Sequence, residues 1–132
     1  MQNNQSQTSG RKSKRKSIDC IQINDLTRTT DYSVIASTGL ITNASTSGFL
    51  LEINREDILR DDLKVNLTLD STLGQPVVLY LPQMNLDLDG TICRTKHLGK
   101  GVFQVAIEFS ADVPEYWRAC LIDLLPEPGE IE

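Results

Sequence analysis

The sequence predicts a mainly β fold: an antiparallel barrel of six or seven strands, preceded by a flexible N-terminal arm and followed by a C-terminal α-helix. Apolar residues alternate with polar ones at a period of two through most of the chain. The separators between these runs are short and rich in turn residues, and only the last segment has helical spacing. The 132 residues, 39% of them hydrophobic, suit one domain with a modest core.

The N-terminal segment differs sharply from the rest. Residues 1–16 contain no apolar residue after Met1, so they cannot bury enough surface to offset chain entropy. We therefore expect a flexible basic arm at 1–16, a barrel domain at 17–126 and an acidic tail at 127–132. The arm holds five of the thirteen lysines and arginines and no acid, which leaves the remainder at a net charge of about −10.

The basic run at 10–17, "GRKSKRKS", has four readings: a solvated tail, a nuclear-import tag, a nucleic-acid arm, or half of a specific anion site. The acidic body lacks the basic face that DNA, RNA or anionic lipid requires. We therefore expect no nucleic-acid partner, and any recognition of an anion must be local.

Seven segments have the character of strands, and their short separators predict antiparallel pairing of successive strands in a meander or small barrel. The predicted strands are 17–24, 33–43, 49–53, 63–69, 77–81, 86–92 and 103–109. Residues 55–62 fit one helical turn. The final helix is predicted because Trp117, Leu121 and Leu124 recur at helical spacing, with Pro114 suited to its first turn and Pro126 to its end.

The cysteines and the hydropathy indicate the compartment. Cys20, Cys93 and Cys120 are widely spaced and form no C-x-x-C, which argues against a disulfide framework or a zinc site. No apolar run approaches the ~20 residues of a membrane span, and the N-terminus lacks the apolar stretch of a secretory signal. We expect a cytoplasmic protein without membrane insertion, present as a monomer or weak dimer.

Residues typical of catalysis are scarce, so we expect no enzyme, metal or cofactor. The single histidine, His97, falls in the polar connection 95–101, which predicts a surface loop. The segment 85–90, "NLDLDG", resembles the start of a calcium loop, but Lys96 occupies the position that needs a bidentate glutamate. No glycine-rich loop leads from a strand into a helix, as a P-loop requires.

Two short motifs remain: R-x-x-x-R at Arg11 and Arg15, and D/N-x-S-x-x-G at Asn43, Ser45 and Gly48. Alone, the first is part of a basic tail. The second alone is a hairpin turn, in which Asn and Ser bond nearby backbone and Gly permits positive φ. Together, in this order and with the strand series and closing helix around them, they resemble the PilZ domain, the bacterial receptor family for cyclic di-GMP. The resemblance covers residues 11 to about 125.

The resemblance implies a PilZ-type β-barrel that binds cyclic di-GMP through the five motif residues. Arginine suits this ligand because its planar fork bonds a phosphate or a guanine O6/N7 edge bidentately and stacks on a purine. The Asn43 oxygen can accept from guanine N1 or N2, more weakly than the Asp that is commoner there, and Ala106 stands where many members have Gly.

The resemblance also implies a mechanism: ligand binding orders the arm, and the chain regulates a partner protein in trans, with motility, exopolysaccharide or virulence as the output. Two alternatives stay open. One is a PilZ-like protein-interaction module that binds no nucleotide. The other is a nucleic-acid binder that uses the basic arm, which the acidic body disfavours.

Overall fold

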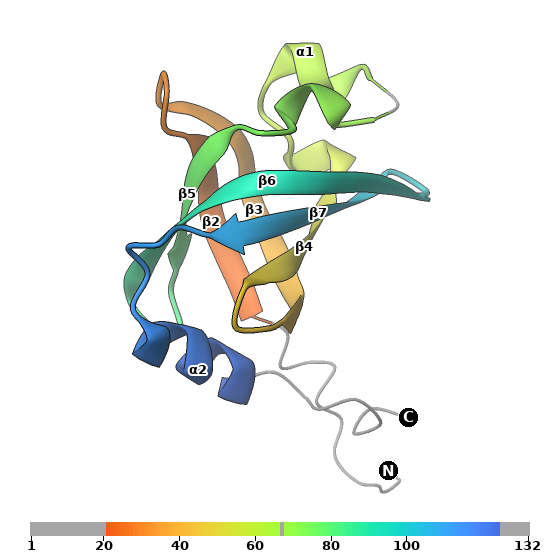
Figure 1. Cartoon of the computed structure of the whole chain (residues 1–132). Coiled ribbons are helices and arrows are strands. Elements are labelled where there is room, and N and C mark those ends of the chain that lie inside the picture. The colour runs from red at the N-terminus through yellow and green to blue at the C-terminus, as the bar shows by residue number, and fades with distance from the viewer. Residues whose placement is uncertain (1–20, 67, 125–132) are drawn as a thin grey trace, which may run out of the picture.

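The computed structural model describes residues 21–66 and 68–124, and they form a closed six-stranded antiparallel barrel followed by a helix (Figure 1). The strands are β2 (Ile21–Arg28), β3 (Ser33–Ala44), β4 (Gly48–Asn54), β5 (Pro76–Leu81), β6 (Leu86–Gly99) and β7 (Val102–Phe109). The predicted fold class is confirmed, with six strands. The predicted arm at 1–16, the start of the first strand at 17–20 and the tail at 127–132 lie outside the described residues.

The barrel consists of two three-stranded meanders that close on each other. β2, β3 and β4 form one meander and β5, β6 and β7 the other. β4 pairs with β7 and β2 with β5, so each of the six strands has two neighbours. Closure leaves no strand of the sheet with a free edge.

The core is built by the period-two pattern of the strands. In β4, for example, Phe49, Leu51 and Ile53 are buried, while the side chains between them are more exposed. β7 contributes Phe103, Val105 and Ile107 to the same core. Alternation at this period places every second side chain inside the barrel, and burial of these side chains is the main force that stabilises it.

The strand predicted at 63–69 is wrong. Residues 55–75 instead contain the short helices η3 (Arg55–Asp57), α1 (Asp61–Lys64) and η4 (Asp70–Thr72), on the opposite side of the barrel from the C-terminal helix (Figure 1). Leu63 and Leu69 are buried, but Val65 is 81% exposed, so the alternation of apolar residues does not produce one buried face. The closed barrel offers this segment no edge on which to pair.

The guanidinium of Arg55 stabilises this segment. It donates hydrogen bonds to the carbonyls of Lys64 at 2.5 Å and of Asn66 at 2.7 Å. It also lies over the Phe103 ring, with 4.9 Å between the guanidinium carbon and the ring centre. Arg55 therefore satisfies carbonyls that the end of α1 leaves without helical partners and fastens the segment to β7.

The predicted surface loop around His97 is also wrong, because β6 continues to Gly99. His97 pairs with Phe103 of β7, and their rings stack with centres 4.8 Å apart. The turn is confined to Lys100 and Gly101, whose φ angles are 56° and 77°. Two consecutive residues with positive φ are typical of a tight type I′ hairpin, which lets both strands extend to the turn.

The C-terminal helix α2 (Glu115–Leu124) is confirmed. Leu121 is buried in the core, and Trp117 packs against it. The Pro114 carbonyl accepts the first helical hydrogen bonds, from the backbone N–H groups of Trp117 and Arg118. No helix among residues 21–66 and 68–124 combines the length and the apolar character needed to cross a membrane.

Candidate ligand-binding site

The segment 43–48 forms the predicted hairpin turn between β3 and β4. The Ser45 backbone N–H donates to the Gly48 carbonyl at 2.8 Å. The Ser45 hydroxyl oxygen accepts from the Ser47 N–H at 3.2 Å and lies 3.0 Å from the Ser47 hydroxyl. The Asn43 side-chain oxygen accepts from the Ala44 N–H at 2.8 Å. These local bonds hold the turn in one shape, with Asn43 and Ser45 exposed.

Gly48 is required by the close approach of β7. A Cβ atom at this position would lie 2.3 Å from the Ile107 carbonyl oxygen and 3.1 Å from the Glu108 Cα. The interpretation of Gly48 as a residue with positive φ is wrong, because the described glycines with positive φ are Gly74, Gly99 and Gly101. Its lack of a side chain allows β4 to pair tightly with β7.

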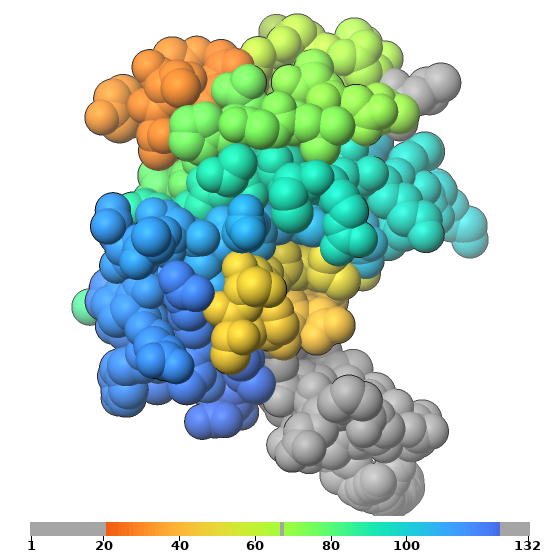
Figure 2. Space-filling model, viewed as in Figure 1, coloured from red at the N-terminus to blue at the C-terminus, as the bar shows by residue number. Residues whose placement is uncertain are grey.

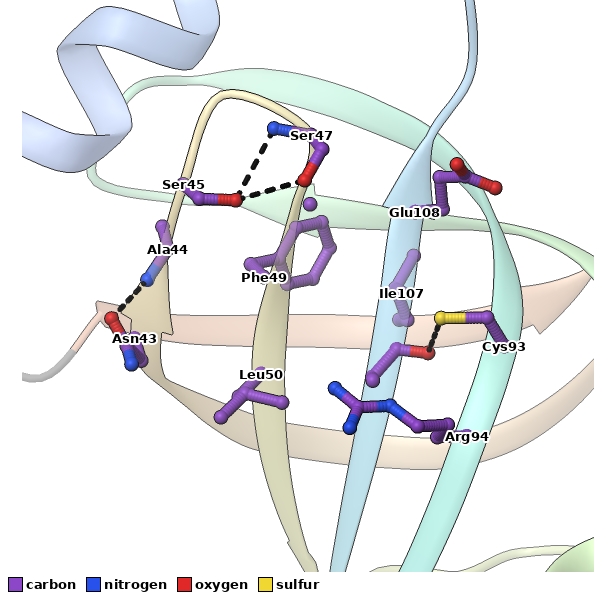
Figure 3. Close-up of a pocket in the computed structure, with 12 residues that line it drawn as sticks. Asn43, Ala44, Ser45, Ser47, Phe49, Leu50, Cys93, Arg94, Ile107 and Glu108 are labelled. Carbon is purple, nitrogen blue, oxygen red and sulfur yellow. Dashed lines mark hydrogen bonds between the residues drawn. The ribbon is translucent and has the colours of Figure 1, made fainter.

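An open groove of about 370 Å³ lies beside this turn, on the outer surface of β4, β7 and β6 (Figure 3). Asn43, Ser45 and Gly48 all line it, so three of the five predicted ligand residues lie together. The other two, Arg11 and Arg15, lie outside the described residues.

The walls of the groove combine apolar and charged groups. Leu50 and Ala106 supply apolar surface, and Arg94 of β6 and Glu108 of β7 supply one exposed cation and one exposed carboxylate. A small apolar surface with a few polar groups around it is typical of sites for small ligands. The groove can thus accept an apolar ring face on Leu50 and an anionic group at Arg94.

Arg94 was not among the residues predicted from the sequence, and a β-bulge explains why. The register between β6 and β7 shifts between Ile92 and Arg94. Cys93 and Arg94 are consecutive and both exposed, whereas strict alternation from Ile92 would turn Arg94 inward. The Cys93 thiol donates to the Ala106 carbonyl at 3.4 Å.

Arg118 of α2 is a second residue that sequence reasoning missed. Its guanidinium donates to the carbonyls of Thr46 at 2.9 Å, Ser110 at 3.0 Å and Val113 at 3.2 Å. It also lies over the Phe109 ring, 5.0 Å from the ring centre. Arg118 therefore connects the turn at the groove to the end of β7 and the start of α2. No local signal marks this role, because Thr46 is 72 positions away in the chain.

The carboxylate with the largest displacement of its pKa lies outside the groove, in the connection between β2 and β3. Asp31 pairs with the Arg28 guanidinium and accepts from the Ser33 hydroxyl at 2.8 Å and the Ser33 N–H at 3.1 Å. These contacts hold the pKa of Asp31 well below its ordinary value, with the hydrogen bond from Arg28 as the largest cause. They favour the charged carboxylate and stabilise the turn.

Among residues 21–66 and 68–124, no three His, Cys, Asp or Glu side chains cluster closely enough to hold a metal ion. Comparison with protein-family models, with curated proteins and with solved structures found no match to this chain.

Proposed function

We propose that this chain is a cyclic di-GMP receptor of the bacterial cytoplasm that regulates a partner protein in trans. The observation that carries the proposal is the position of Asn43 and Ser45 on one groove, opposite the cation Arg94. The sequence resemblance to PilZ domains supplies the identity of the ligand. The groove supports it with donors, acceptors, a positive charge and an apolar surface in one place.

In this proposal, the two arginines of the arm reach the groove from the start of β2. Ile21 pairs with Ile41, which is two residues before Asn43. Arg15 precedes Ile21 by six residues, and an extended chain of that length spans about 20 Å. Arg11 is four residues further from Ile21 and can extend beyond the turn. In this proposal, the two arginines bind the phosphates or the guanine O6/N7 edges from the solvent side.

Ordering of the arm on the ligand is the proposed signal. The arm has too little apolar surface to fold alone, so the ligand would supply its contacts and create a new protein surface for the partner. Arg118 offers a route for this signal into α2, because its guanidinium bonds the Thr46 carbonyl of the turn.

The hydrogen bonds of the turn favour a second candidate function, a protein-interaction module that binds no nucleotide. The Asn43 oxygen and the Ser45 hydroxyl both have partners within the turn. These bonds explain both residue types without any ligand. The two functions differ in one measurable property, the affinity for cyclic di-GMP.

Isothermal titration of the 132-residue chain with micromolar cyclic di-GMP tests the proposal. We expect heat from the wild type and a loss of binding in the Arg11→Ala, Arg15→Ala double variant. The matched control is Lys12→Ala, Lys14→Ala, which removes the same charge from the same arm and should retain most of the affinity. Absence of heat from the wild type favours the interaction module. Equal losses of affinity in the two double variants would mean that the arm acts only through its overall positive charge.

The Asn43→Asp variant provides a second test of the guanine contact. A carboxylate accepts a stronger hydrogen bond from guanine N1 and N2 than an amide does, so we expect affinity to rise by about three- to tenfold. An unchanged or lower affinity, measured in the same titration, would contradict the contact proposed for Asn43.

A further inference from the structure

A second hollow continues the groove beyond Arg94. It has a volume of about 320 Å³, and Leu50, Cys93, Arg94 and Ala106 line both hollows. The two hollows therefore form one extended groove over the outer surface of β4, β7 and β6. Figure 2 faces this side of the molecule, with the turn before β4 in yellow, β7 in blue and β6 in blue-green.

The second hollow has its own polar and apolar groups. Leu73 is 45% exposed and supplies apolar surface at the far end. Lys96 and Gln104 face each other across β6 and β7. The Asp70 carboxylate accepts a hydrogen bond from the Thr95 hydroxyl at 2.6 Å, which occupies one of its oxygens. The hollow thus offers a cation, an amide and one carboxylate beside an apolar surface.

Arg94 lies where the two hollows meet. Its side chain extends across β7 toward Leu50, from the bulged part of β6 (Figure 3). The ion pairs found within residues 21–66 and 68–124 are Arg28–Asp31 and Arg60–Asp62, so Arg94 forms no direct ion pair with a carboxylate of this part of the chain, although Glu108 lines the same groove. A guanidinium in this position is available to bind an anion from either hollow.

We propose that Arg94 binds a phosphate of the ligand at this junction and that the second hollow receives the second nucleotide half. Each hollow is near the lower limit of about 300 Å³ for ligand pockets, which suits one nucleotide half rather than the whole ligand. A ligand with two nucleotide halves and phosphates between them matches two hollows with a cation between them. This inference rests on the proposed function, since it assigns a second part of the same ligand to a second part of the same groove.

Arginine suits the junction better than lysine. Its planar fork can bond two phosphate oxygens at once, and its flat face can stack on a purine in either hollow. Leu50 and Ala106 line both hollows and lie next to Arg94 across β7 and β4, so apolar groups border this contact on one side.

Titration of the full chain with cyclic di-GMP tests the inference through two variants. Arg94→Gln removes the charge, and we expect a loss of affinity of about tenfold or more. Gln104 lines the second hollow and not the first, so Gln104→Trp is chosen to fill the second hollow, and it should weaken binding by a similar factor. The matched control is Lys100→Gln, which removes an exposed cation from the β6–β7 turn outside both hollows and should bind as the wild type does.

The outcomes separate this inference from the proposed function. If the wild type binds and either Arg94→Gln or Gln104→Trp binds equally well, the inference is overturned while the proposed function stands. If the wild type binds no cyclic di-GMP, both the proposed function and this inference are wrong. Circular dichroism of each variant checks that the barrel is intact, which is expected because Arg94 is exposed and Gln104 is only half-buried.

Discussion

Gly48→Ala tests whether the glycine of the second motif serves the fold rather than the ligand. The added Cβ would lie 2.3 Å from the Ile107 carbonyl oxygen. Non-bonded heavy atoms in contact lie about 3.5 Å apart, so β4 and β7 would have to separate by about 1 Å. That movement also stretches the hydrogen bond from the Phe109 N–H to the Ser47 carbonyl, which is 2.9 Å long.

The expected cost combines three terms. Overpacking of this kind costs about 1–3 kcal/mol, and weakening one hydrogen bond adds about 1 kcal/mol. The lower entropy of an unfolded chain with Ala returns about 0.4–1 kcal/mol. Taking the middle of each range, we therefore expect the free energy of unfolding to fall by about 2 kcal/mol.

Urea denaturation measures this change. With a slope of about 2 kcal/mol per molar, the midpoint should fall by about 1 M. Thr46→Ala, an exposed position in the same turn, is the matched control and should change stability by less than about 0.5 kcal/mol. A urea midpoint for Gly48→Ala equal to that of the wild type would refute the steric argument. The proposed contact with a ligand would then be the remaining explanation for the glycine.

Three further predictions concern stability. Arg118→Ala removes three hydrogen bonds to carbonyls and should lower the free energy of unfolding by about 2 kcal/mol; an unchanged urea midpoint would contradict its linking role. The lowered pKa of Asp31 means that its pairing with Arg28 stabilises the fold above the unfolded pKa. The wild type should therefore have a higher free energy of unfolding than Asp31→Asn, with the full difference above about pH 5 and a smaller one as the pH falls below about 4. A difference that does not change with pH in urea denaturation would refute this prediction. Leu63→Ala should lower the free energy of unfolding by about 2–5 kcal/mol and Val65→Ala by close to nothing. Similar losses for both variants in thermal denaturation would support the strand that the sequence predicts at 63–69.

The alternation of apolar residues predicted most strands correctly because it reports which face of a strand is buried. The same pattern failed at 63–69, where Leu63 and Leu69 are buried and Val65 is exposed. A strand requires a partner as well as a buried face, and closure of the barrel through β2–β5 and β4–β7 left none for this segment. At this segment, alternation therefore predicted neither a strand partner nor a single buried face.

The candidate site was predictable only where its residues are local. Asn43 and Ser45 bond backbone within the turn, and short motifs encode such bonds directly. Arg94 required knowledge of a bulge that turns it outward, and Arg118 required the position of α2 beside the turn. The exposure of Arg94 depends on the register of β6 against β7, and the link from Arg118 to the turn spans 72 positions, so no local pattern could identify these roles.

The sequence by itself determined the mainly β class, the turn at 43–48, the closing helix and the separation of charge between a basic arm and an acidic body. These follow from hydrophobic period, turn chemistry and composition, which are properties of short segments. Only the tertiary structure decided that β4 lies against β7, that Gly48 is needed there, and that Arg94 faces a groove with Asn43 and Ser45. Those features depend on contacts between distant segments, whose positions are set when the whole barrel closes around its core.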